Sequence, residues 1–234
     1  MPSQTEFNLK LAGKVFNAKV FFKSTKDFCQ KYICQEPAEE TVSVIDSDVQ
    51  NEKACFPNIS EESAEIFALH RKLVHSLLHH NVILFHGSAV CLDGKGYIFT
   101  APSGTGKSTH AEKWHRLFGA SYINDDKPLI KIDKKAIAYG SPWMGEHNLG
   151  ENASCPIEAV FVIVRSEENR IEAVSENDAF FELIKQTYIP KDKEKANSVI
   201  KLVKSLSKLI KVYRLYCNMD DESAQIAIKG IDNK

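Results

Sequence analysis

Apolar residues recur along this chain at intervals that predict alternating helices and strands. Ser60 is followed by an acidic turn and then by Leu69, Leu73 and Leu77 at helical spacing, so we expect a helix from Ser60 through His80. Further helices are predicted over residues 25–34, 107–118, 175–188 and 193–209, with a short one from residue 221.

Strand patterns separate these helices. Residues 7–22 alternate between apolar and polar side chains like a hairpin, which turns either at Gly13 or at Asn17-Ala18. The nearly continuous apolar run of residues 157–164 predicts a strand that is buried on both faces. Further strands are predicted over residues 41–45, 82–92, 96–101, 121–124, 129–132, 136–140 and 211–217.

These elements predict a chain of two parts. Residues 1–57 are expected to form a small N-terminal α/β lobe, in which the acidic stretch 36–52 is a solvated loop, and residues 58–234 a catalytic domain. Asp93-Gly94 is a hairpin signal, so the strand that follows it has an antiparallel neighbour directly before it. The expected fold class is therefore α/β with a mixed sheet.

Composition excludes several classes of protein. The hydrophobic content of 43% and charged content of 26% are ordinary for a soluble domain, and the formal net charge of −1 argues against a nucleic-acid partner. No apolar run is long enough to span a membrane, and residues 1–10 contain no apolar signal core. We therefore expect a cytoplasmic protein, whose six cysteines, without C-x-x-C spacing, are reduced thiols.

The strongest motif is a glycine-rich loop between a predicted strand and a predicted helix. Residues 101–109 read Ala-Pro-Ser-Gly-Thr-Gly-Lys-Ser-Thr and fit a relaxed Walker A pattern. Its glycines let backbone N–H groups surround a phosphate, Lys107 can reach the terminal phosphates, and the Ser108 hydroxyl suits Mg²⁺. The residues expected to bind the nucleotide are Ser103, Gly104, Thr105, Gly106, Lys107, Ser108 and Thr109.

Two further groups are expected at this loop. Asp125 and Asp126 follow a predicted strand, and phosphoryl transfer needs one carboxylate for Mg²⁺ and another for the attacking hydroxyl. A solvated turn is the alternative for this pair. Counting register from the predicted hairpin turn places His86 at the mouth of the loop, where it supports an aspartate or a phosphate, unless it is a core histidine.

Together these residues resemble the catalytic core of HPr kinase/phosphorylase, which is related to phosphoenolpyruvate carboxykinase. The resemblance implies Asp125 as catalytic base, Asp126 as metal residue, His86 and Lys107 in the catalytic site, and the cofactors ATP and Mg²⁺. Related kinases form homo-oligomers, and similar small proteins phosphorylate a serine of a precursor peptide. The matching segments are residues 86–89, 103–108 and 124–126.

Residues 140–148 stand where that family has its signature segment, so HPr itself is not the expected acceptor. Trp143 and Glu146 lie in this stretch, either as part of a loop that closes over the site, with Glu146 as a further metal ligand, or as a packed loop anchored by Trp143. Arg165, after the predicted buried strand, is either a cation for transition-state charge or a structural arginine.

The sequence thus predicts an ATP- and Mg²⁺-dependent kinase that phosphorylates a hydroxyl, expected to be a serine of a peptide or protein. A small hydroxyl metabolite is the alternative acceptor. A different class of function is a nucleotide-binding accessory protein without transfer activity. The lysine-rich stretch 185–214 either docks an acidic peptide or is a solvated helix face.

Overall fold

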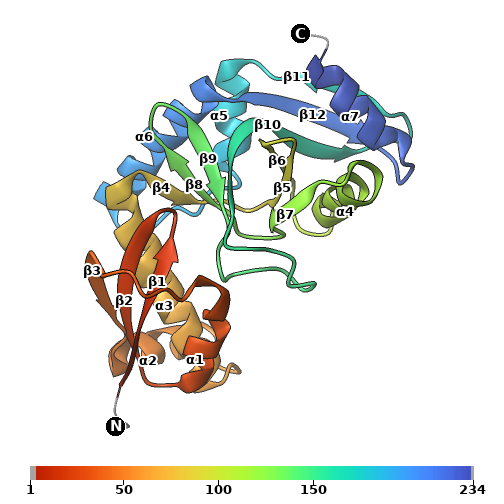
Figure 1. Ribbon diagram of the computed structural model, residues 1–234. Coiled ribbons are helices and arrows are strands. Elements are labelled where there is room, and N and C mark those ends of the chain that lie inside the picture. The colour runs from red at the N-terminus through yellow and green to blue at the C-terminus, as the bar shows by residue number, and fades with distance from the viewer. Residues whose placement is uncertain (1–3, 233–234) are drawn as a thin grey trace. The chain divides into compact units, whose positions relative to one another are not determined.

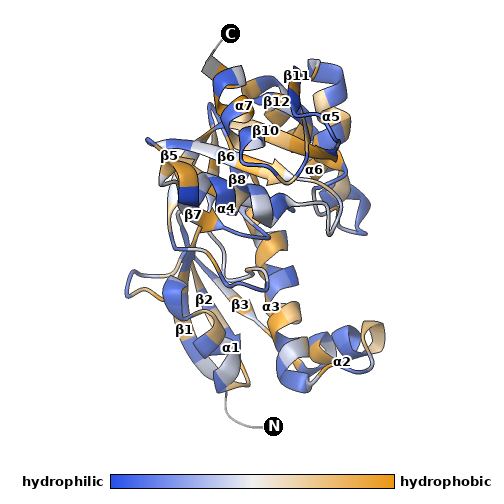
Figure 2. Cartoon of the chain, turned by 90° about the vertical axis from the view of Figure 1, so that its right-hand side faces the viewer, coloured by the Kyte–Doolittle hydropathy of each residue, from blue (hydrophilic) through white to orange (hydrophobic). Residues whose placement is uncertain are grey.

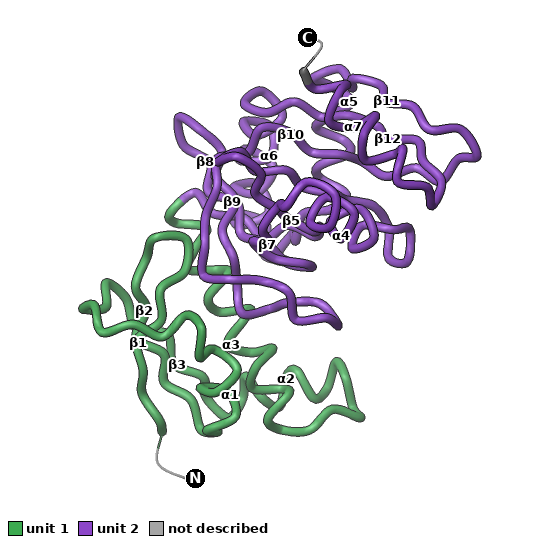
Figure 3. Tube along the Cα trace, turned by 45° about the vertical axis from the view of Figure 1, so that its right-hand side comes forward, with its two compact units in different colours: residues 1–80 green, residues 81–234 purple. Residues whose placement is uncertain are grey.

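The computed structural model describes residues 4–232 and divides the chain into two compact units, Met1–His80 and Asn81–Lys234 (Figure 3). The division falls after the helix α3 (Glu61–Leu77) and the short 3₁₀ turn η2 (Leu78–His80), whereas the sequence placed it at residue 57. The difference arises because α3 buries its apolar face against elements of the first unit.

The first unit contains a three-stranded sheet in the order β1 (Thr5–Leu11), β2 (Lys14–Val20), β3 (Glu40–Ser43). Strands β1 and β2 pair antiparallel, and β3 runs parallel to β2. The hairpin turns at Ala12-Gly13, both with positive φ, which decides between the two turns that the sequence allowed.

Three helices accompany this sheet: α1 (Lys23–Phe28), which continues into the 3₁₀ turn η1 (Gln30–Tyr32), then α2 (Asp46–Cys55) and α3. The prediction of a solvated loop over residues 36–52 was wrong in its second half, where α2 forms. Val49 and Glu52 are buried there, and Arg71 of α3 pairs with Glu52, with Nε 2.6 Å from Oε1.

A buried carboxylate of α3 fixes the start of α1. Glu65 is fully buried, and its oxygens accept the backbone N–H groups of Phe21 at 2.5 Å and Phe22 at 3.0 Å. The Thr25 hydroxyl donates to the same carboxylate at 2.5 Å. Glu65 therefore supplies from another helix the cap that Phe22 cannot supply itself.

The second unit is built on a curled mixed sheet in which β10 is the central strand. The sheet runs in the order β4-β8-β9-β10-β6-β5-β7, and β12 pairs with both β10 and β11. The strands are β4 (Val82–Leu84), β5 (Ser88–Leu92), β6 (Lys95–Thr100), β7 (Ser121–Asn124), β8 (Leu129–Ile132), β9 (Ala136–Tyr139), β10 (Ser154–Arg165), β11 (Arg170–Ala173) and β12 (Lys211–Cys217). Apolar residues are concentrated on β10 (Figure 2).

The predicted hairpin before the glycine loop is confirmed. β5 and β6 pair antiparallel, and Asp93 and Gly94 between them have φ of 51° and 74°. β7 is antiparallel to β5, while β10 is parallel to β6. Consequently β7, β6 and β10 all point the same way, and their carboxyl ends meet at one edge of the sheet.

Helices cover both faces of this sheet. α4 (Lys107–Phe118) and α7 (Glu222–Asp232) lie on one side, and α5 (Glu176–Ile184) and α6 (Lys193–Leu209) on the other (Figure 1). Trp114 anchors α4, because its ring lies 4.6 Å from that of Tyr97, 5.4 Å from Phe99 and 5.8 Å from Phe161, centroid to centroid. Gly119, with φ of 73°, ends α4 as the sequence predicts.

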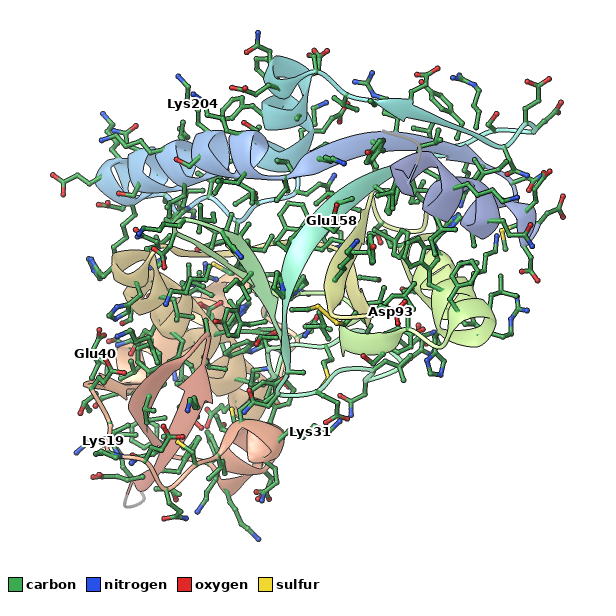
Figure 4. The ribbon with its side chains drawn as sticks, turned by 45° about the horizontal axis from the view of Figure 1, so that its top comes forward. Lys19, Lys31, Glu40, Asp93, Glu158 and Lys204 are labelled. Atoms are coloured by element: carbon green, nitrogen blue, oxygen red, sulfur yellow. A yellow bond between two sulfur atoms is a disulfide. The ribbon has the colours of Figure 1, made fainter. Side chains whose placement is uncertain are left out.

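Two of the cysteines expected to be reduced are joined. Cys91 of β5 and Cys155 of β10 form a disulfide with Cα atoms 6.2 Å apart, drawn as a yellow bond in Figure 4. β6 lies between these strands, and a Cβ at Gly96 would meet the carbonyl oxygens of Pro156 at 2.9 Å and of Cys155 at 3.3 Å. A glycine at this point lets the chain at Cys155 approach closely enough to reach Cys91.

Among residues 4–232, no helix has both the length and the apolar surface that crossing a bilayer requires. The lysines of α6 lie on its exposed side, and Lys204 projects outward in Figure 4.

Candidate nucleotide and phosphoryl-transfer site

The glycine loop joins the buried strand β6 to the first residue of α4. Gly104 and Gly106 have φ of 74° and 121°, which L side chains rarely adopt, and a Cβ at either position would meet nothing within 4 Å. The loop therefore requires glycine for its conformation and leaves open space beside it. A helix N-terminus directed at that space favours an anion.

Lys107 lies within this loop with only 8% of its surface exposed. Its ammonium donates to the carbonyl oxygens of Ala101 at 3.1 Å and Pro102 at 3.3 Å. Burial lowers the pKa of Lys107, and the negative charge of Asp126 acts in the opposite direction. The ammonium of Lys107 therefore lies against the start of the glycine loop, and Ser108 is exposed on the first turn of α4.

A fully buried asparagine shapes the acidic turn at the end of β7. Asn124 accepts at Oδ1 the N–H groups of Asp126 at 2.9 Å and Lys127 at 2.6 Å. Its amide donates to the carbonyl oxygen of Ser141 at 3.0 Å. This side chain turns the backbone so that two consecutive carboxylates face different neighbours. An asparagine before a turn is a recognisable signal in a sequence, but Asn124 was not among the expected site residues.

Asp126 contacts His86 and lies close enough to Lys107 of the glycine loop for the two charges to interact. The Nε2 atom of His86 lies 3.3 Å from Oδ1 of Asp126, and Lys127 donates to the other carboxylate oxygen. The hydrogen bond with His86, followed by Lys127, holds the pKa of Asp126 well below its usual range. His86 therefore contacts Asp126 through its imidazole, and its backbone carbonyl accepts a hydrogen bond at 2.7 Å from the hydroxyl of Thr100, the last residue before the glycine loop.

Asp125 is buried, with 4% exposure, beneath the loop of residues 140–150. Its oxygens accept the backbone N–H of Gly145 at 2.7 Å and of Leu149 at 3.2 Å. Trp143 is buried and anchors this loop. Residues 140–150 thus form a packed loop anchored by Trp143, and the backbone of this loop contacts one of the two carboxylates.

Glu146 was the third residue expected to hold a metal. Its side chain is exposed, and no described contact joins it to Ser108 or Asp126. Within residues 4–232, no three His, Cys, Asp or Glu side chains are grouped closely enough to hold a metal by themselves. Mg²⁺ bound with a nucleotide needs only one or two protein oxygens besides phosphates and water, and Ser108 and Asp126 supply oxygens of that kind.

No protein-family model and no curated protein matches the chain. Among solved structures it is similar to the HPr(Ser) kinase/phosphatase from Coxiella burnetii, with 12% sequence identity and a TM-score of 0.35. The match covers 64% of this chain and 97% of that one. A likeness at this identity and TM-score assigns neither a family nor an activity to this chain.

Proposed function

We propose that this chain is an ATP- and Mg²⁺-dependent kinase that phosphorylates a hydroxyl, a serine of a peptide or protein. The observation that carries the proposal is the ionised Asp126, which faces Lys107 of the glycine loop and is held by His86. A cation in a glycine-rich loop and a carboxylate that can hold Mg²⁺ are groups that phosphoryl transfer from a nucleotide needs.

Each residue then has a role. The backbone of residues 103–109 and Lys107 bind the phosphates, while Ser108 and Asp126 hold Mg²⁺, which neutralises charge that develops on the phosphates. The acceptor oxygen bonds to the γ-phosphorus, the bond to the β–γ bridging oxygen breaks, and Asp125 takes the hydroxyl proton. Because both oxygens of Asp125 accept loop N–H groups, the acceptor replaces at least one of these hydrogen bonds.

The test is phosphate transfer from γ-labelled ATP to serine-containing peptides, compared for the wild type, Asp125→Asn and the exposed control His147→Gln. We expect Asp125→Asn to lower transfer by at least about 100-fold while nucleotide still binds, because a general base contributes that much. His147→Gln should match the wild type. Full turnover by Asp125→Asn would exclude Asp125 as the base.

The burial of Asp125 under residues 140–150 also favours a second function, a nucleotide-binding accessory protein whose loop responds to ATP. Such a protein binds nucleotide and transfers no label to any acceptor. Label that appears on a small hydroxyl compound and not on peptides would instead identify a metabolite kinase.

A further inference from the structure

Arg165 is the last residue of β10 and lies beside the glycine loop. β10 runs parallel to β6, and their register pairs Val162 with Thr100. Arg165 is three residues further along β10, where it pairs with Cys217 of β12. Its position is therefore set by the pairing of two buried strands and not by a flexible surface segment.

The guanidinium of Arg165 touches the loop itself. Its Nη2 atom donates to the carbonyl oxygen of Gly104, one of the two glycines with positive φ. The side chain is exposed, and the hydrogen bond to Gly104 uses one of the five N–H donors that a guanidinium carries. A planar guanidinium with several donors is suited to phosphate oxygens.

The sheet order decides which side of the loop Arg165 occupies. In the order β10-β6-β5-β7, Arg165 approaches from the β10 side, whereas His86 and Asp126 approach from the side of β5 and β7. In phosphoryl transfer the attacking and leaving oxygens lie roughly in line across the γ-phosphorus. If the acceptor binds on the side of the acidic pair, the leaving diphosphate lies on the opposite side.

We infer that Arg165 binds the diphosphate part of the nucleotide, the leaving group of the reaction, as a second cation beside Lys107. The inference rests on the proposed nucleotide site and adds to it a residue for which the sequence left two roles open. Its contact with the Gly104 carbonyl orients the guanidinium in the absence of nucleotide. When nucleotide binds, the other N–H groups donate to phosphate oxygens.

The experiment measures the dissociation constants of Mg-ADP and Mg-ATP by calorimetry for the full chain and for Arg165→Gln. Glutamine keeps a polar side chain with an N–H donor and removes the charge of the guanidinium. We expect about tenfold weaker binding of both nucleotides, because a hydrogen bond between charged groups is lost. The affinity should also depend less steeply on salt concentration.

Two further variants complete the design. Arg165→Lys keeps the charge and should lose less affinity than Arg165→Gln. Arg116→Gln is the matched control, because Arg116 is an exposed arginine of α4 that pairs with Asp221 at 2.5 Å. Arg116→Gln should bind both nucleotides like the wild type.

Unchanged affinity of Arg165→Gln for both nucleotides would overturn the inference and leave Arg165 as a structural residue. A loss confined to Mg-ATP would overturn it too, because Arg165 would then lie at the γ-phosphate. A wild-type chain that binds neither nucleotide would contradict the proposed function itself, which is a different result.

Discussion

His110 is a buried histidine directly behind the glycine loop. It lies on the first turns of α4 with 2% exposure, its Nε2 atom is 3.1 Å from the sulfur of Cys217, and its ring stacks on Phe99. Burial, assisted by the positive charge of Lys113, lowers the pKa of His110 to about 4. The folded chain therefore holds this imidazole neutral at pH values where an unfolded chain would protonate it.

This difference predicts a pH dependence of stability. Between pH about 6.5, where an unfolded histidine titrates, and pH about 4, the unfolded chain binds one more proton, so the free energy of unfolding falls as pH falls. The loss from His110 is about 3 kcal/mol across this window. Urea unfolding at several pH values should show a shallower slope for His110→Gln and the wild-type slope for His147→Gln. An unchanged slope for His110→Gln would contradict the burial argument.

The residues of the site differ in how far the sequence predicts them. The glycine loop and Lys107 are recognisable because their chemistry requires a fixed local order of residues. The partner of His86 cannot be recognised in the sequence, because the side chain of Asn124 decides which way each carboxylate points. Asn124 does so through hydrogen bonds with the backbone of Lys127 and of Ser141, which lies in another segment. Adjacent aspartates look equivalent in a sequence until the side chain that turns the backbone is known.

At the scale of elements, the sequence predicts a helix or strand correctly where both its apolar pattern and its end signals are present. α4, α6, β7 and β12 have the predicted bounds, and caps mark the helix ends, such as Gly119 for α4 and Asp192 for α6. The helix α2 was missed because it is acidic, and Glu52 becomes a buried residue only through Arg71 of α3. β11 was missed because it is short and mostly exposed, and only its pairing with β12 defines it.

The start of α1 is a case in which one element depends on another. If Glu65 is replaced by alanine, two backbone N–H groups and the Thr25 hydroxyl lose their acceptor inside the first unit. We expect the free energy of unfolding to fall by about 3 kcal/mol. Urea denaturation measures it.

Glu62→Ala provides the comparison for this test, because Glu62 lies on the exposed first turn of the same helix. Its effect should stay within about 0.5 kcal/mol. Equal effects of the two substitutions would show that the cap of α1 does not depend on Glu65.

At the scale of the whole molecule, the candidate site belongs to one unit. All residues assigned to it, from His86 to Arg165, lie in the second unit, which has its own core around Trp114. From the sequence we expected two parts with α3 in the second, whereas α3 belongs to the first unit. The pattern of a helix shows which face is apolar but not which element packs against that face.

We therefore predict that a fragment of residues 81–234 folds and binds Mg-ATP with the affinity of the full chain. Circular dichroism checks the fold and calorimetry the binding, with Lys107→Ala in the same fragment as the control that should not bind. A folded fragment without affinity would mean that the first unit contributes to nucleotide binding.

The tight turn at Asp93-Gly94 fixes the register of β5 against β6. Both residues have positive φ, and the five pairs that follow, from Leu92 with Lys95 to Ser88 with Phe99, fix the position of His86 relative to the glycine loop. The turn itself contacts neither His86 nor the glycine loop, but the number of residues from the turn to each of them sets their relative position. An added residue in that turn would shift the pairing of β5 with β6 and move His86 relative to the glycine loop, so a turn distant from the proposed site sets the alignment within it.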